Sequence, residues 1–272
     1  MPCLKTDVPK NENLIELPDT ESISHSGKIY DLLEAGSPYY LEQQKDIAFW
    51  TNIAKKYGDT ILELACGTGR IAIPLAEQGF RVTGIDISES MLEVAAKKSS
   101  QLEWLQADVG NFDIGKKFSL IIFPYNSMLF CSERENIDSC LSCVRKHLKT
   151  GGKFVIDVLN PSPEYLINLF MCKNKELLST FEDPDGKGTI VVTRTREYDP
   201  AKQMVTQKRF FKLPGEAQEI VEEIKYHLYF PQEIETLLKY NGFQVESKFG
   251  DYQGTTFTSS SPKQLIVSGM RE

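Results

Sequence analysis

The stretch Thr60-Ile-Leu-Glu-Leu-Ala-Cys-Gly-Thr-Gly-Arg70 carries the strongest structural signal in this 272-residue sequence. It opens as a short apolar run with one acid inside it, closes with Gly67-Thr68-Gly69, and continues into a helical pattern that reaches Glu77. Strand, glycine turn and helix in this order form the unit that binds nucleotide-like cofactors. The glycines let the backbone approach a ligand because no Cβ is in the way, and the helix start directs unpaired N–H groups toward it.

The choice of cofactor depends on the acid inside the strand. Gly67-x-Gly69-x-x-Ala72 satisfies the loose dinucleotide pattern, so NAD is one alternative, and a glycine turn without any ligand is another. Glu63 lies just before the glycines, where a carboxylate would repel a pyrophosphate but attract the sulfonium and ammonium of S-adenosylmethionine (SAM). The unit also follows about sixty residues of leader, whereas many NAD domains begin at their first strand. These features favour SAM.

The pattern acid-x-x-Cys-Gly-x-Gly from Glu63 to Gly69 resembles motif I of the class I SAM-dependent methyltransferases. The resemblance extends from about Tyr30 to the C-terminus. It implies a Rossmann-like α/β fold, with a seven-stranded, mostly parallel sheet whose last strand is antiparallel. It also implies SAM as cofactor and S-adenosylhomocysteine as product. The motif I residues that it assigns to SAM are Glu63, Ala65, Gly67, Thr68, Gly69 and Arg70.

A second strand is expected over Phe80–Asp86, and it ends on an acid. Asp86 follows the glycines by about twenty residues, the separation expected for a carboxylate that accepts from ribose hydroxyls. Ser88 is expected to cap the following helix. By the resemblance, Ile87 and Met91 flank the adenosine, although Met91 as plain core is an alternative.

The next two strands contribute the remaining expected contacts. By the resemblance, Asp108 after the third strand meets the adenine amino group, with Val109 beside it, and the alternative for Asp108 is a loop cap. Phe118–Phe123 is near-continuously apolar, as a strand buried on both faces should be. Its last residue, Phe123, is expected at the cofactor, and the loop that follows leaves the carboxyl end of the strand, where open α/β sheets bind ligands.

That loop, Pro124-Tyr-Asn-Ser-Met128, looks like the post-strand-four loop of amino-sugar N-methyltransferases. It also partly resembles the Asn-Pro-Pro-Tyr signature of amino-group methyltransferases, but Phe123 stands where the amide should be. We therefore take Tyr125 and Asn126 as catalytic candidates. Met128 stands where some of the sugar enzymes carry a histidine, so no general base is transferred.

Composition shifts predict four parts: a mobile tail over residues 1–25, a SAM-binding core with a helical cap over 26–160, a β-rich insertion or lid over 161–229, and the C-terminal part of the core over 230–272. The aromatic-rich cap resembles the one that closes over the cofactor in small-molecule methyltransferases. Tyr30 is therefore expected at SAM, and Tyr39 and Tyr40 nearby, with plain packing as the alternative. Turn signals divide the insertion into strands over 177–181, 189–198, 204–212 and 217–229.

The insertion is expected to supply acceptor specificity. Its aromatic residues can wall off water and shape an apolar pocket, and His227 among them is the third catalytic candidate. The alternative is a dimerisation surface. The aromatic residues in question are Tyr198, Phe210, Phe211, Tyr226 and Tyr229.

Composition limits the partners. The net charge is −7, and no basic stripe offers a grip on nucleic acid. No apolar run approaches the roughly 20 residues of a membrane helix, and the first residues lack a signal-peptide core, so a cytoplasmic protein is expected, and a homodimer is possible. Cys140-x-x-Cys143 lies in a helical pattern, with small helix residues as the favoured interpretation over a redox or metal role. We expect no metal site.

These observations predict an enzyme that transfers the SAM methyl group to a nitrogen or oxygen of a small molecule. A neutral amine needs little help from a base, whereas a hydroxyl usually needs a base or a metal. The chain has three histidines, and this scarcity favours an amine. The alternatives are a SAM-binding protein without turnover and a methyltransferase that acts on a macromolecule.

Overall fold

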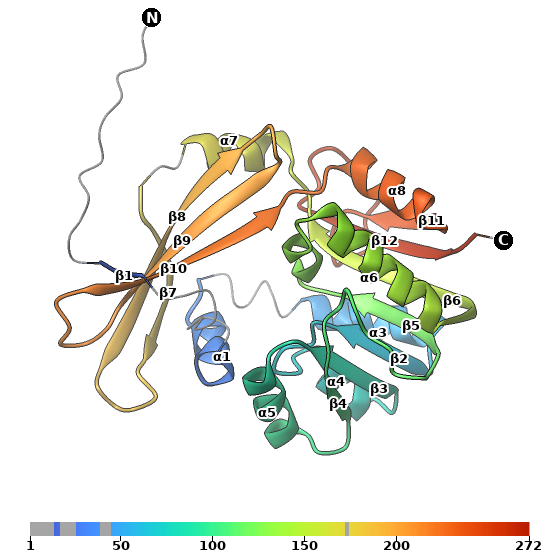
Figure 1. Cartoon of the computed structure of the whole chain (residues 1–272), viewed down its shortest axis with the longest axis horizontal. Helices are drawn as coiled ribbons and strands as arrows, with labels where there is room; N and C mark the ends of the chain where they lie inside the picture. The colour runs from blue at the N-terminus through green and yellow to red at the C-terminus, as the bar shows by residue number, and fades with distance from the viewer. Residues whose placement is uncertain (1–13, 17–25, 39–44, 172–173, 272) are drawn as a thin grey trace, which may run out of the picture.

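The computed structural model describes residues 14–16, 26–38, 45–171 and 174–271. Tyr39 and Tyr40 of the predicted cap lie outside the described residues, as does the predicted tail apart from residues 14–16. Two sheets stand apart, and helix α1 lies between them (Figure 1). The seven-stranded sheet contains β2 (Thr60–Leu64), β3 (Arg81–Asp86), β4 (Glu103–Gln106), β5 (Phe118–Phe123), β6 (Leu148–Leu159), β11 (Phe243–Phe249) and β12 (Lys263–Met270). The five-stranded sheet, here called the second sheet, contains β1 (Leu14–Glu16), β7 (Glu176–Glu182), β8 (Thr189–Asp199), β9 (Met204–Lys212) and β10 (Glu219–His227).

The helices are α1 (Gly27–Ala35), α3 (Asp46–Tyr57), α4 (Ala72–Glu77), α5 (Glu89–Lys98), α6 (Arg134–His147), α7 (Pro163–Met171) and α8 (Pro231–Tyr240), with the 3-10 turn η1 at Ser127–Phe130. The large sheet has the order β11-β12-β6-β5-β2-β3-β4, and β12 runs antiparallel to both of its neighbours. The other pairs are parallel. The predicted fold class is confirmed. Because the chain builds outward from β2 to β4 and then restarts at β5, the topological switch point lies between β2 and β5, where such sheets bind ligands.

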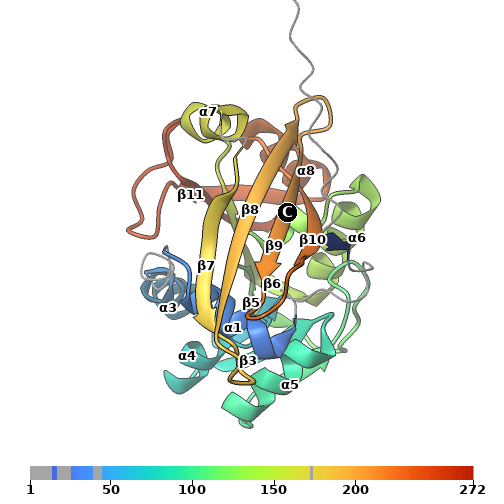
Figure 2. The same cartoon turned by 90° about the vertical axis from the view of Figure 1, so that its left-hand side faces the viewer.

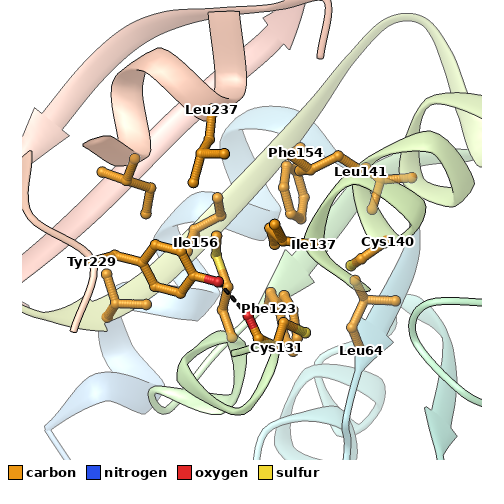
Figure 3. Packing of buried hydrophobic residues seen from close by; sticks show 14 of the residues in the cluster. Leu64, Phe123, Cys131, Ile137, Cys140, Leu141, Phe154, Ile156, Tyr229 and Leu237 are labelled. Carbon is orange, nitrogen blue, oxygen red and sulfur yellow. Dashed lines mark hydrogen bonds between the residues drawn. The ribbon is translucent and has the colours of Figure 1, made fainter. Parts of the chain in front are cut away.

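The central strands are buried on both faces, as their continuous apolar runs predict. Leu64 and Phe123 point to a core on one face that α6 and α8 complete, and Figure 3 shows Phe123 beside Ile137 of α6 and Leu64 beside Cys140. Ile61 and its neighbours point to the opposite core, which α3 and α4 cover. Cys140 lies fully buried in the first core, as the interpretation of small helix residues predicted.

The second sheet has the order β1-β10-β9-β8-β7, and its four longer strands are antiparallel with bounds close to those predicted. Figure 2 shows these strands side by side. Three features differ from the predictions. Residues 14–16, assigned to the tail, pair in parallel with β10. Helix α7 was not predicted. The early start of β6 was not predicted either: its residues 149–152 include Gly151 at φ +75°, and the pairing of β6 with β5 has a register shift between Phe118 and Leu120.

Two glycines hold α1 between the sheets. A Cβ on Gly27 would lie 2.2 Å from the carbonyl oxygen of Ser90 in α5, and one on Gly36 would lie 2.3 Å from that of Thr180 in β7. The Leu33 carbonyl also accepts a hydrogen bond of 2.7 Å from Ser179 Oγ. Each end of α1 thus approaches a different part of the molecule, and the residues in its middle lie at the boundary between the two sheets.

Candidate functional site

A cavity of about 860 Å³ lies at the carboxyl ends of β2, β3 and β5, between α1 and the second sheet. Its volume lies within the range of small-molecule sites. The residues predicted from sequence that line it are Tyr30, Ala65, Gly67, Asp86, Ile87, Met91, Asp108, Val109, Phe123, Tyr125 and Asn126. Residues from five separate segments are therefore brought together at the switch point.

The glycine turn is open toward this cavity. Ala65 and Gly67 have φ values of +52° and +54°, and a Cβ added to Gly67 would meet no atom within 4 Å. The left-handed conformation costs a residue with a Cβ about 1–2 kcal/mol. Ala65 therefore holds a strained backbone at the cavity wall, and such strain is concentrated at functional sites.

Asp86 joins the glycine turn to the start of α5. Its Oδ2 accepts from the Gly67 N–H at 2.8 Å and its Oδ1 from the Ser88 N–H at 2.9 Å. Ser88 Oγ accepts from the Met91 N–H at 3.3 Å, so the predicted helix cap is confirmed. Each carboxylate oxygen has a second lone pair, and both oxygens therefore retain capacity for a ligand hydroxyl.

Asp108 caps its own loop by accepting from the Gly110 N–H at 2.7 Å, and it lines the cavity as well.

Glu63 lies behind the glycine turn and does not line the cavity, which corrects the expectation of a direct contact. The side chain is buried, one oxygen accepts from the Ala72 backbone, and Oε2 has no hydrogen-bond partner among the described residues. Burial raises the pKa of this carboxyl well above its ordinary value. An opposite charge placed near the turn would favour its ionised form.

Three other motif I residues also support the turn from behind and are absent from the cavity lining. Thr68 Oγ1 donates to Asp31 Oδ1 at 2.6 Å. Gly69 permits close packing, since a Cβ there would lie 2.8 Å from the Trp104 ring. Arg70 points away from the cavity, donating to both carboxylate oxygens of buried Asp46 at 2.8 and 2.7 Å.

The loop after β5 is held in an unusual conformation. Tyr125 and Asn126 have φ values of +57° and +63°, and Asp157 accepts from both backbone N–H groups, through its carboxylate and its carbonyl respectively, at 2.9 Å. Lys263 Nζ donates to Asn126 Oδ1 at 3.1 Å and to Asp157 Oδ1 at 2.9 Å. Tyr125 OH in turn donates to Glu34 Oε2 at 2.6 Å. The loop therefore links the core to a carboxylate of α1 inside the cavity.

The structure places His227, the third catalytic candidate, away from the cavity. Side chains alternate along a strand, and its neighbour Tyr226 faces the cavity, so His227 faces the other way. Its Nε2 lies 2.8 Å from Glu233 Oε1 of α8. Tyr229 packs in the core, where its hydroxyl donates to the Cys131 carbonyl (Figure 3).

Sequence reasoning missed the polar side of the cavity. Of the five aromatic residues expected to form an apolar wall, Tyr226 lines the cavity, whereas Phe211 packs against Leu33 of α1. The second sheet lines the cavity mainly with polar and charged side chains, and α1 adds Glu34. These missed residues are Glu34, Arg194, Arg196, Gln207 and Arg209. The spacing of Arg194 and Arg196 on one strand face was the available signal.

Three phenols of the cavity are poor bases. Burial raises the pKa values of Tyr30, Tyr125 and Tyr226 above the ordinary range of tyrosine, so all three stay protonated at neutral pH. Within the residues that the structure describes, no three His, Cys, Asp or Glu side chains gather where they could hold a metal ion. No described helix is long and apolar enough to cross a membrane.

Known proteins resemble the chain in sequence and in fold. Residues 61–152 match the family model described as a methyltransferase domain. The chain is 30% identical over 242 residues to the putative methyltransferase YqeM of Bacillus subtilis (strain 168), covering 86% of this chain and 92% of that protein. It is 27% identical over 130 residues to a dTDP-3-amino-3,4,6-trideoxy-alpha-D-glucopyranose N,N-dimethyltransferase of Streptomyces venezuelae, covering 47% and 55%. The structure of the CcbJ methyltransferase from Streptomyces caelestis is similar in fold, with a TM-score of 0.70 at 22% identity, covering 87% of this chain and 98% of that one.

Proposed function

Because this chain belongs to the family of SAM-dependent methyltransferases, with SAM as its cofactor, we propose that it methylates an amino group of a small molecule. One observation carries the proposal. A single cavity joins the glycine turn and Asp86 at one end to the Glu34 and Tyr125 pair at the other. Cofactor and acceptor can therefore occupy one shared space, as direct transfer requires. The amino-sugar methyltransferase among the relatives acts on an amine by its name, which supports this choice of acceptor.

The cavity walls fit SAM. The open space in front of Gly67 can receive a ligand close to the backbone, and Asp86 keeps acceptor capacity for ribose hydroxyls. The partnerless oxygen of Glu63 behind the turn favours a cation there. We assign Ile87 and Met91 to the flanks of the adenosine, and Asp108, Val109 and Phe123 to the adenine end, with Tyr30 closing from α1. Bound SAM supplies a methyl group activated on a sulfonium.

Glu34 would hold the acceptor amine. Its carboxylate can accept a hydrogen bond from an acceptor N–H, which leaves the nitrogen lone pair directed elsewhere. Tyr125 OH fixes one oxygen of this carboxylate at 2.6 Å. The Tyr125 ring is in turn backed by the Arg70 guanidinium, 4.6 Å from its centroid. Asn126, in its strained conformation beside Lys263, forms the floor of the same end of the cavity.

We further propose that residues 161–229 form a lid over a core made of residues 26–160 and 230–272. A lid excludes water from the reacting groups, and Tyr226 at the cavity wall serves this end. The alternative is that the second sheet is a dimerisation surface. The expectations of a homodimer, of a cytoplasmic location and of no nucleic-acid binding stay predictions, which sedimentation, cell fractionation and a gel-shift assay can check.

The test is to incubate the protein with SAM and a panel of small amines and alcohols, and to measure S-adenosylhomocysteine. We expect product with one or more amines, and its absence with every member would leave a SAM-binding protein without turnover or a macromolecular acceptor.

Two neighbouring residues give a matched pair of variants. Tyr226→Ala should reduce transfer at unchanged SAM affinity, whereas His227→Ala should leave transfer near that of the parent. Variants that keep full turnover but lose self-association would identify the sheet as an interface.

A further inference from the structure

The inner face of the second sheet carries a row of charges across four strands. Pairing register places Glu176 of β7 opposite Arg194 of β8, Arg194 opposite Arg209 of β9, and Arg209 opposite Glu222 of β10. The side chains in such a row point to the same face of the sheet. Arg196 lies two residues further along β8, on the same face and toward the cavity.

The two kinds of charge in this row are not equivalent. The three arginines line the cavity, whereas Glu176 and Glu222 at the ends of the row do not. Glu176 accepts from Arg194 Nε at 3.3 Å and from Arg196 Nη2 at 3.1 and 3.2 Å, which fixes both guanidinium groups from the side. The carboxylates therefore orient the arginines, and the arginines present their remaining donors to the cavity. Five N–H donors on each guanidinium make this set larger than one carboxylate can satisfy.

Arg209 supplies an independent observation. Its Nε is buried and has no hydrogen-bond partner among the described residues, and its nearest carboxylate contact, Nη1 to Glu222 Oε2, is 3.5 Å long. Burial lowers the pKa of this guanidinium. Leaving a buried donor unpaired is costly, so sites of this kind are built for a partner. Arg209 itself lines the cavity.

We propose that Arg194, Arg196 and Arg209, here called the lid arginines, bind an anionic group of the acceptor. This deepens the proposed function, on which it rests. The acceptor is then an amine that also carries a phosphate or a carboxylate. Guanidinium forks match both groups in bidentate geometry. The cavity presents an anion-binding side on the second sheet and a carboxylate, Glu34, on α1, so an acceptor with opposite charges at its two ends is oriented in one direction.

Binding of a bare anion tests the subsite without any turnover. Pyrophosphate and malonate are titrated by calorimetry into the complex with S-adenosylhomocysteine, and sodium chloride of equal ionic strength is the blank. Arg196→Gln should weaken the binding of the preferred anion by about tenfold or more. The matched control is Lys208→Gln, which removes one positive charge next to Arg209 on the outer face of the same strand and should change affinity less than twofold. A melting temperature and an affinity for S-adenosylhomocysteine equal to those of the parent verify that each variant is folded. If Arg196→Gln does not fold, Arg194→Gln takes its place.

Turnover with matched amines distinguishes phosphate from carboxylate. The pairs are ethanolamine against O-phosphoethanolamine, and glycinamide against glycine. We expect faster formation of S-adenosylhomocysteine with the anionic member of at least one pair, and we expect Arg196→Gln to remove that preference. Three results would overturn the inference while the methyltransferase activity stands. Neither anion binds, or Lys208→Gln weakens anion binding as much as Arg196→Gln does, or the uncharged member of each pair is methylated faster. If no amine in either pair or in the wider panel is methylated, the proposed function fails, and the calorimetry alone decides the subsite.

Discussion

Replacing Asp86 by alanine should weaken SAM binding and lower stability together, because its carboxylate has two tasks. Both oxygens accept from backbone N–H groups at 2.8 and 2.9 Å, and both retain a lone pair for the ribose diol. Each hydrogen bond to a charged acceptor is worth about 1.5–3 kcal/mol. Loss of one such bond to the cofactor therefore costs about tenfold or more in affinity.

The stability cost comes from the same atoms. Without the carboxylate, the N–H groups of Gly67 and Ser88 lose their acceptor in a partly buried place, at about 1–3 kcal/mol each where water does not replace it. We expect the fold to be retained but the apo protein to melt at a lower temperature. Asp86→Asn keeps one acceptor oxygen, and its affinity and stability should fall between those of the parent and the alanine variant.

The assay is calorimetry with SAM, run beside thermal unfolding of each apo variant. Glu93→Ala is the control, because it removes an exposed acid from α5, the helix that follows Asp86. Its affinity should match that of the parent. An unchanged dissociation constant for Asp86→Ala would remove this residue from the cofactor site. A loss of affinity in Glu93→Ala equal to that in Asp86→Ala would show that general charge, and not the ribose contact, is responsible.

Three further predictions concern the glycine turn. Gly67→Val should abolish SAM binding in calorimetry, because its side chain would fill the open space before the turn and strain φ +54°; binding equal to the parent would contradict the assignment of the turn. Ala65→Gly should raise the free energy of unfolding in urea by about 0.5–1 kcal/mol at unchanged SAM affinity, since it relieves φ +52°, and a clear loss of stability would show that the alanine methyl group packs usefully. Glu63→Gln should stabilise the apo protein relative to the parent, and increasingly so as pH rises from about 4.3. The pKa of Glu63 is raised in the folded state, so the unfolded chain releases its proton first and the parent loses stability until the pH reaches the folded pKa. A difference in melting temperature that does not change with pH would refute this.

The sequence was sufficient for the large sheet because its signals are local. Apolar runs buried on both faces, the glycine turn and the acid at the end of β3 each lie within a few residues of the contact that they predict. The separation of Gly67 and Asp86 was informative because Asp86 ends β3 and Gly67 follows the adjacent parallel strand β2, so that their atoms meet at 2.8 Å. The strands of the insertion were also predicted closely, because turn signals bound each of them.

The acceptor side could not be derived in this way, because it depends on which face of a strand the rest of the molecule covers. The alternation of side chains along a strand predicts that Tyr226 and His227 face opposite sides of the sheet, but not which of them faces the cavity. Contacts of Gly27 with α5 and of Gly36 with β7 decide that question by placing α1 between the sheets, and neither glycine carries a signal for its partner. Once α1 is placed there, Glu34 lies opposite the charged face of the second sheet. Under the proposed function, acceptor choice is set by how these two separately predictable parts are joined, and variants of the two glycines should alter acceptor choice before they alter SAM binding.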